Sequence, residues 1–186
     1  NENKKNRYIL PIFIVFLMVA SGFAVIFSNP SEDSTESYKH NGILFMKKGG
    51  DWAANVQDFQ LYLTYGPRDL NEVEIDPSVY ELLKAEKIYY SINSKDFLGN
   101  SERDLFYNLK PAINSLTKAC LADSEECKEL PLKTCEDADD KTKIIVLKLS
   151  EEKRVKYEND CYVIEGNSDY LTKVVDKIVL ILFGVI

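Results

Sequence analysis

The stretch TKIIVLKLSEEKRVKYENDCYVIEGNSDYLTKVVDKIVLIL, residues 142–182, decides the fold class. Apolar and β-branched residues fill 142–149, 154–158 and 161–166, and short polar segments separate them, which predicts three strands joined by tight turns. From Ser168 the apolar residues follow the helical period: Leu171, Val174, Val175, Ile178, Ile181 and Leu182. The closing VLILFGVI is apolar all round, which indicates a helix end buried in the core.

Upstream of this stretch, helical and strand patterns alternate. Asp76 followed by Pro77 predicts the start of a short helix that leads into a strand over 87–92. A helix is expected over 102–118, with a kink or a break at Pro111. If the strands on either side of it are parallel, this order predicts a right-handed crossover.

The first part of the domain is rich in strand patterns. ILFMKK and WAANVQ flank Gly49, Gly50 and Asp51, which predicts a hairpin, and FQLYLTY predicts a third strand that ends before Gly66 and Pro67. The whole pattern predicts an α+β (mixed α/β) domain over 41–186, with one mixed β-sheet covered by two or three helices.

Residues 8–27, YILPIFIVFLMVASGFAVIF, contain no charge and are long enough for a transmembrane helix. A cleaved signal peptide is the alternative, with Ala20, Ser21 and Gly22 at the cut. The apolar run continues beyond that point to Phe27, so a retained anchor is the preferred interpretation. A buried core helix is less favoured because the segment has no polar face.

Charge predicts the orientation of this anchor. Residues 1–7 carry Lys4, Lys5 and Arg7 against Glu2, which predicts a cytoplasmic N-terminus, and the polar segment 28–40 is expected to be a linker. The whole chain has a net charge of −7 and residues 1–7 contribute +2, which leaves −9 for the part predicted to lie outside the cell membrane. This charge argues against nucleic acid as a partner.

All four cysteines, Cys120, Cys127, Cys135 and Cys161, follow the anchor. An even number of cysteines outside the cytoplasm predicts disulfides, whereas the spacing lacks the close pairs that zinc or redox sites use. Three pairings are possible, and the sequence alone does not choose among them. The preferred one joins Cys120 to Cys127 and Cys135 to Cys161.

A further pattern combines Cys120, Cys127, Pro131 and Cys135 with CYVIEG and a closing helix that ends in LFGVI. In this arrangement the chain resembles a group of uncharacterised single-pass membrane proteins from archaea, over roughly its last hundred residues. The resemblance implies an anchored extracytoplasmic module. It implies no known activity, so it transfers no catalytic residues.

The sequence shows no catalytic constellation and predicts no cofactor. The one histidine, His40, lies at the end of the expected linker, and the chain has neither a nucleophile elbow nor a phosphate-binding loop. Acidic side chains gather in one loop and are weak candidates for a metal site, with a solvated loop preferred: Glu136, Asp137, Asp139 and Asp140.

Aromatic residues in the predicted strands give the remaining hint of a binding surface. Most are expected to complete the core, while Trp52, Tyr62 and Tyr65 are candidates for an exposed surface. The preferred function is a non-catalytic binding or assembly module of the cell envelope, tethered to the membrane and serving a protein partner. An extracytoplasmic enzyme that uses carboxylates, with or without a metal, is the alternative, and a thiol oxidoreductase is third.

Overall fold

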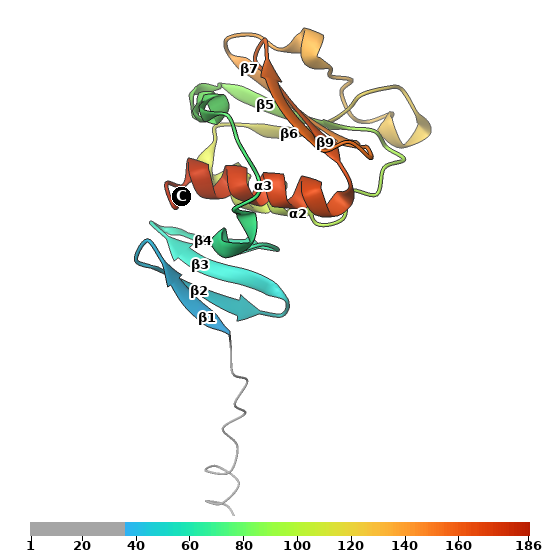
Figure 1. Cartoon of the computed structure of the whole chain (residues 1–186). Coiled ribbons are helices and arrows are strands. Elements are labelled where there is room, and N and C mark those ends of the chain that lie inside the picture. The colour runs from blue at the N-terminus through green and yellow to red at the C-terminus, as the bar shows by residue number, and fades with distance from the viewer. Residues whose placement is uncertain (1–35) are drawn as a thin grey trace, which may run out of the picture. The chain divides into compact units, whose positions relative to one another are not determined.

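Two β-sheets enclose a layer of helices in residues 36–186, the part of the chain that the computed structural model describes (Figure 1). The predicted mixed α+β class is confirmed, but the strands form two sheets instead of one. The predicted cytoplasmic residues 1–7 and transmembrane helix 8–27 lie outside the described residues. From Glu36 onwards, no helix has both the length and the apolar character that crossing a membrane requires.

The first sheet is an antiparallel meander of four strands, which are β1 (Ser37–His40), β2 (Ile43–Lys48), β3 (Asp51–Val56) and β4 (Phe59–Leu63). Lys48 pairs with Asp51 across Gly49 and Gly50, whose φ angles are +59° and +98°. A two-residue turn with positive φ at both positions matches the twist of a hairpin and favours glycine. The predicted hairpin is therefore confirmed.

The second sheet has the strand order β6-β5-β7-β9-β8. Strand β5 is parallel to both β6 and β7, β7 is parallel to β9, and β8 and β9 form an antiparallel hairpin. These strands are β5 (Lys87–Ile92), β6 (Leu116–Cys120), β7 (Thr142–Leu149), β8 (Arg154–Glu158) and β9 (Cys161–Gly166). The sheet is mixed, as predicted.

The helical layer consists of α3 (Ser168–Leu182) and of α2 (Ser101–Asp104), which continues as the π-helical turn η3 (Leu105–Leu109). The side chain of Asn167 caps α3 by accepting a hydrogen bond from the backbone N–H of Tyr170. Shorter 3₁₀ helices are η1 (Pro67–Leu70), η2 (Pro77–Lys84), η4 (Lys110–Ala112), η5 (Glu125–Cys127) and η6 (Cys135–Asp137).

Two predicted boundaries differ from the structure. The helix expected over 102–118 ends at Ala112, next to Pro111. Leu116–Cys120 forms strand β6 instead, because each of these residues pairs with a residue of β5. The expected linker 28–40 includes β1, whose Tyr38 stacks on Phe45 in the core, so the described fold starts before Asn41.

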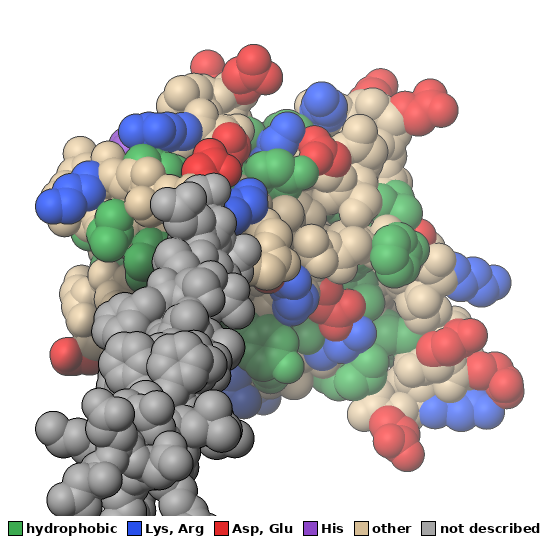
Figure 2. All heavy atoms as spheres, turned by 90° about the horizontal axis from the view of Figure 1, so that it is seen from below, with side chains coloured by type: hydrophobic (Ala, Val, Ile, Leu, Met, Phe, Trp, Pro, Cys, Tyr) green, Lys and Arg blue, Asp and Glu red, His purple; other side chains and the backbone are tan. Residues whose placement is uncertain are grey.

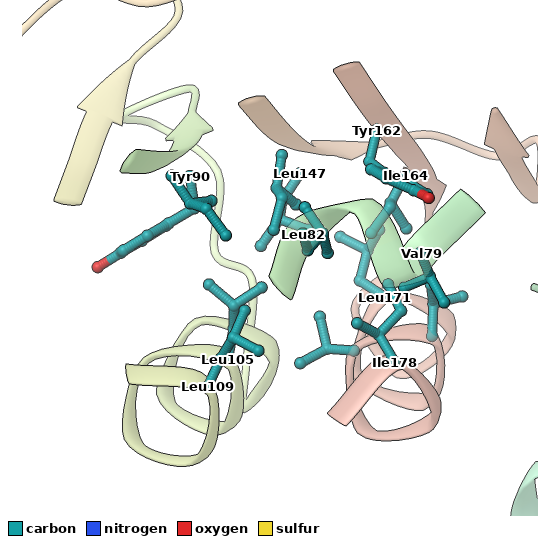
Figure 3. Packing of buried hydrophobic residues seen from close by; sticks show 14 of the residues in the cluster. Val79, Leu82, Tyr90, Leu105, Leu109, Leu147, Tyr162, Ile164, Leu171 and Ile178 are labelled. Atoms are coloured by element: carbon teal, nitrogen blue, oxygen red, sulfur yellow. The ribbon is translucent and has the colours of Figure 1, made fainter. Parts of the chain in front are cut away.

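Helix α3 contributes to two hydrophobic cores. Leu171, Val174, Val175 and Ile178 pack beneath the second sheet, as Figure 3 shows for Leu171 and Ile178. Val179, Leu180 and Phe183 belong to the core of the first sheet. The predicted burial of the chain's last helical segment is confirmed, and it results from contact with a sheet on each side.

Both preferred disulfides are present, Cys120–Cys127 and Cys135–Cys161. The second connects η6 to β9 on the face of the second sheet that is opposite the helices, where Cys161 packs with Ile144 and Ala119. Cys120, Cys127 and Cys161 are buried, and Cys161 belongs to a small core against which Cys135 packs.

Candidate binding site

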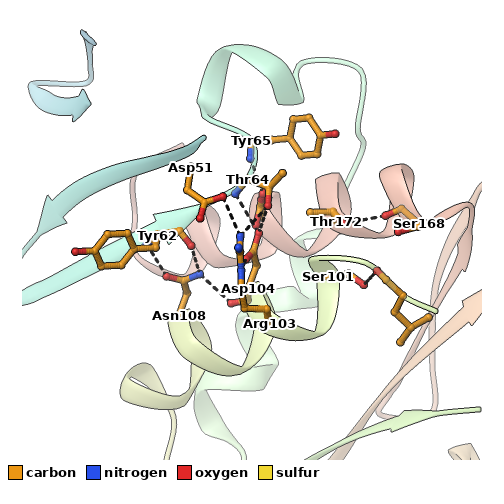
Figure 4. A network of polar contacts seen from close by, with 12 residues as sticks. Asp51, Tyr62, Thr64, Tyr65, Ser101, Arg103, Asp104, Asn108, Ser168 and Thr172 are labelled. Atoms are coloured by element: carbon orange, nitrogen blue, oxygen red, sulfur yellow. Dashed lines mark hydrogen bonds and ion pairs between the residues drawn. The ribbon is translucent and has the colours of Figure 1, made fainter. Parts of the chain in front are cut away.

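The outer edge of strand β4 is held by side chains from the helical layer (Figure 4). The backbone N–H of Tyr62 donates to Asn108 Oδ1 at 2.9 Å, and Asn108 Nδ2 donates back to the Tyr62 carbonyl at 2.7 Å. The N–H of Thr64 donates to Asp104 Oδ2 at 3.0 Å. Because an edge strand leaves its polar groups unpaired, these side chains take the place of a fifth strand.

Asp104 and Asn108 are four residues apart, at the junction between α2 and η3. Asn108 Nδ2 also donates to the Asp104 carbonyl at 2.9 Å, which fixes the amide against the turn. Asn108 is 2% exposed and Asp104 is 1% exposed. The two side chains therefore form a buried and rigid polar floor, in a π-helical segment of the kind that is often found at functional sites.

Arg103 lies beside this floor and contacts two carboxylates. Its Nε donates to Asp104 Oδ1 at 2.7 Å, and its Nη2 donates to Asp51 Oδ1 at 3.0 Å and to Thr64 Oγ1 at 3.1 Å. The guanidinium charge is offset by these partners. Through this one side chain, helix α2 is joined to strand β3 and to the residue that follows β4.

A second buried carboxyl group approaches from α3. Asp176 is fully buried, and its Oδ2 accepts a hydrogen bond from the backbone N–H of Tyr65 at 2.8 Å. Burial raises the pKa of Asp176 well above its usual range, and the nearby charge of Asp104 adds to the effect. Burial therefore favours the protonated form of this carboxyl group, and its Oδ1 has no hydrogen-bond partner among residues 36–186.

Two pockets open at the surface next to this network. One has a volume of about 320 Å³, and its walls include Asp51, Gln60, Tyr62 and Asn108. The other has a volume of about 350 Å³, and its walls include Tyr90, Glu102 and Phe106. Arg103 and Tyr107 line both pockets, and we call the pair of pockets the Tyr107 site.

Exposed aromatic rings border the Tyr107 site. Tyr107 is 70% exposed and Tyr62 is 44% exposed. The hydroxyl of Tyr62 donates to Gln60 Oε1 at 2.7 Å, which restrains the ring, and the ammonium group of Lys110 lies 4.8 Å from the ring centre of Phe106. The site thus combines accessible aromatic surface with polar groups that are already in place.

The three aromatic residues that were predicted as candidates for an exposed binding surface lie in different environments. Tyr62 lies in the Tyr107 site, but Trp52 is only 5% exposed and packs against Tyr38, so the prediction of an exposed Trp52 is wrong. Trp52 points inward on β3, and it has space there because Gly66, which carries no side chain, lies against its ring.

Tyr65 points away from Tyr62, on the other side of the polar network (Figure 4). Its hydroxyl donates to Asp169, and the ammonium group of Lys173 lies 5.0 Å from its ring centre. The bond to Asp169, together with burial, raises the pKa of Tyr65 to about 12. Tyr65 is therefore engaged within the fold. Tyr107 is absent from the sequence-based candidates, although its place off the apolar helix stripe was a usable signal of exposure.

The acidic loop uses its carboxylates for local turns. Asp137 Oδ2 accepts from the N–H of Thr134 at 2.8 Å, and Asp139 Oδ1 accepts from the N–H of Thr142 at 2.7 Å. Backbone hydrogen bonds lower the pKa of both carboxyl groups. In the described range, no three His, Cys, Asp or Glu side chains are arranged to hold a metal ion, and this includes the candidates Glu136 and Asp140.

No protein-family model matches the sequence, and no curated protein and no solved structure is significantly similar to it. The function is therefore inferred from the geometry and chemistry of the Tyr107 site.

Proposed function

We propose that the chain is a non-catalytic binding module of the cell envelope, and that the Tyr107 site is its binding surface. In this proposal residues 8–27 anchor the chain in the membrane, and the domain from Glu36 onwards lies outside the cell. The main support for this proposal is the position of Tyr107. Its side chain is 70% exposed and lines two pockets, and its backbone belongs to a turn that is fixed by buried hydrogen bonds. The expected partner is another component of the cell envelope, and the prediction from the sequence is that this partner is a protein.

The disulfides support the extracytoplasmic location. Both bridges are formed, and residues 36–186 contain no free cysteine. Disulfides of this kind persist in oxidising compartments and are rare in the cytosol. The tether remains part of the proposal, because it depends on the uncharged sequence of residues 8–27.

The residue types at the site favour binding. Tyrosine and arginine are among the side chains that most often supply binding energy at interfaces. The buried side chains of Asp104 and Asn108 are rigid before binding, which lowers the entropic cost of association. Tyr62 and Arg103 are both held by hydrogen bonds to neighbouring side chains. The surface is therefore pre-organised.

A carboxylate enzyme is the second candidate, and the neighbouring acids Asp104 and Asp176 are the observation in its favour. Enzymes that use paired carboxyl groups often raise the pKa of one of them, as burial does for Asp176. Here, however, the two side chains are 1% and 0% exposed. Because both carboxyl groups are buried, a substrate cannot reach them, and the geometry favours a structural role for both acids.

Photo-cross-linking in the native membrane tests the proposal. A benzophenone amino acid would replace Tyr107 in the full chain, and Tyr80, which is 46% exposed on η2 and lies outside the site, would carry the same group as a control. We expect an adduct from position 107 that is absent from position 80. Equal labelling from both positions, or none from 107, would contradict the proposed site.

An alkaline wash of the same membranes tests the tether. The full chain should remain in the membrane pellet, and a variant that lacks residues 8–27 should be released. A mature chain that begins at or after Phe23 would show a cleaved signal peptide instead.

A further inference from the structure

Each charged side chain in the walls of the Tyr107 site is paired with an oppositely charged side chain. Arg103 contacts the carboxylates of Asp51 and Asp104, and Glu102 pairs with Lys118 at 2.6 Å. Where Figure 2 shows side chains on the underside of the domain, acidic and basic groups are likewise intermixed. An anionic ligand would have to compete with two carboxylates for Arg103, and a cationic ligand would meet the guanidinium itself. A neutral ligand meets neither obstacle.

Polar groups at the rim remain available to such a ligand. Gln60 is exposed, and it uses its carbonyl oxygen to accept from Tyr62, which leaves its amide N–H groups as donors. The Asp51 side chain is 27% exposed, and Arg103 is the one side chain in residues 36–186 that donates to it. With the Tyr107 hydroxyl, the rim offers donors and acceptors next to aromatic faces.

We propose that the Tyr107 site binds a neutral saccharide chain, an inference that rests on the binding function proposed above. One face of a pyranose ring carries C–H groups, which pack on the electron-rich face of a tyrosine ring. Its edge carries hydroxyl groups that both donate and accept hydrogen bonds, and these match the amide of Gln60 and the carboxylate of Asp51.

The ligand is an oligosaccharide of at least two units. Tyr107 lines both pockets, so one sugar unit can occupy each side of its ring. Phe106 provides a further aromatic wall in the second pocket. A peptide strand is disfavoured, because Asn108 and Asp104 already occupy the edge of β4 to which it would add.

Direct binding to the full chain in detergent micelles tests the inference. The probes are neutral hexasaccharides of glucose, mannose and N-acetylglucosamine, the neutral glycans released from the protein's own envelope, and an anionic galacturonate hexasaccharide. We expect at least one neutral probe to bind, and to bind more tightly than the anionic one. Absence of binding by every neutral probe, or tighter binding of galacturonate, overturns the inference.

Matched variants locate the binding. Tyr107→Ala should weaken the neutral saccharide by about tenfold or more, and Gln60→Ala by about fivefold, whereas Tyr80→Ala should leave the affinity unchanged. All three side chains are exposed, so the fold should tolerate each change. Equal affinity of Tyr107→Ala and the unchanged chain would place the saccharide elsewhere and contradict the inference.

The cross-link at position 107 separates this inference from the proposed function. If deglycosylation of the membranes abolishes the adduct, both stand, and protease or lipid extraction then distinguishes a glycoprotein from a glycolipid as the source of the saccharide. If the adduct survives deglycosylation, the binding function stands and the saccharide inference fails. If no adduct forms, the proposed site itself fails.

Discussion

Asp176 places a carboxyl group inside the domain, where α3 passes the end of β4. The neighbouring groups are Asp104 and Arg103 of α2 and the backbone N–H of Tyr65. A protonated acid suits this position, because it brings no second negative charge next to Asp104 and still accepts a hydrogen bond. The pKa shift of Asp176 therefore has a consequence for the stability of the whole domain.

We expect the stability of the unchanged domain to fall as pH rises above about pH 5, where an aspartic acid of ordinary pKa is ionised in the unfolded chain. The pKa of Asp176 is raised in the folded state, so the unfolded chain releases this proton first, and rising pH then favours unfolding. Asp176→Asn keeps an oxygen acceptor and cannot ionise, and it should remove this slope. Urea unfolding at several pH values measures it. An identical slope in the variant would show that Asp176 is not the responsible group.

Asp176→Ala provides the contrast. It leaves the N–H of Tyr65 without its partner, and it should cost about 1–3 kcal/mol at the low end of that range. The cost should shrink as pH rises, because the variant also lacks the carboxyl group that destabilises the unchanged domain at higher pH. Carboxyl groups with lowered pKa, such as those of Asp160 and Glu165, titrate below the range, so they do not obscure the comparison.

At the scale of elements, one amide makes two of the hydrogen bonds that attach β4 to the helical layer. Asn108→Ala removes both hydrogen bonds to the backbone of Tyr62 and should lower the free energy of unfolding by about 1–3 kcal/mol. Tyr107→Ala, on the same turn, should change it by less than about 0.5 kcal/mol because Tyr107 is exposed. Denaturant unfolding compares the two. Similar losses would mean that the turn as a whole, and not the amide, holds the strand.

Helix α3 is expected to be sensitive on two faces. Ile178→Asp and Val179→Asp each place a charge in a different core, and each should cost more than about 3 kcal/mol, enough to unfold many domains. Lys173→Ala, at a partly exposed position on the same helix, should cost less than about 1 kcal/mol. Circular dichroism reports the outcome. A well-folded Val179→Asp variant would show that the first sheet does not depend on α3.

For the whole molecule, the two disulfides should contribute unequally. Cys135 and Cys161 are 26 residues apart and Cys120 and Cys127 are 7 apart. In the chain-entropy model the longer loop is worth about 3–4 kcal/mol and the shorter about 2 kcal/mol. Replacing both cysteines of a pair by serine should therefore destabilise more for Cys135 and Cys161. Thermal unfolding of the two double variants tests the order, and a reversed order would mean that local packing outweighs loop length.

The sequence by itself determined much of the local structure in the second half of the described chain and one turn in the first half. Strands β7, β8 and β9, helix α3 and the turn at Gly49 and Gly50 follow from patterns of ten to fifteen neighbouring residues, as local periodicity and turn chemistry require. The cysteines indicated disulfides because of their number and predicted compartment, and the preferred pairing is the one observed.

Only the tertiary structure decided which of these elements meet. Leu116–Cys120 is a strand because β5 offers it a partner, and this outweighs the helical spacing of its apolar residues. The Tyr107 site depends on the contact between Tyr62 and Asn108, which are 46 residues apart. Next to the site, Tyr65 contacts Asp176, 111 residues away. Such pairs leave no periodic trace in the sequence, because the polar groups of an edge strand are satisfied by whichever side chains the packing of the helices places beside them.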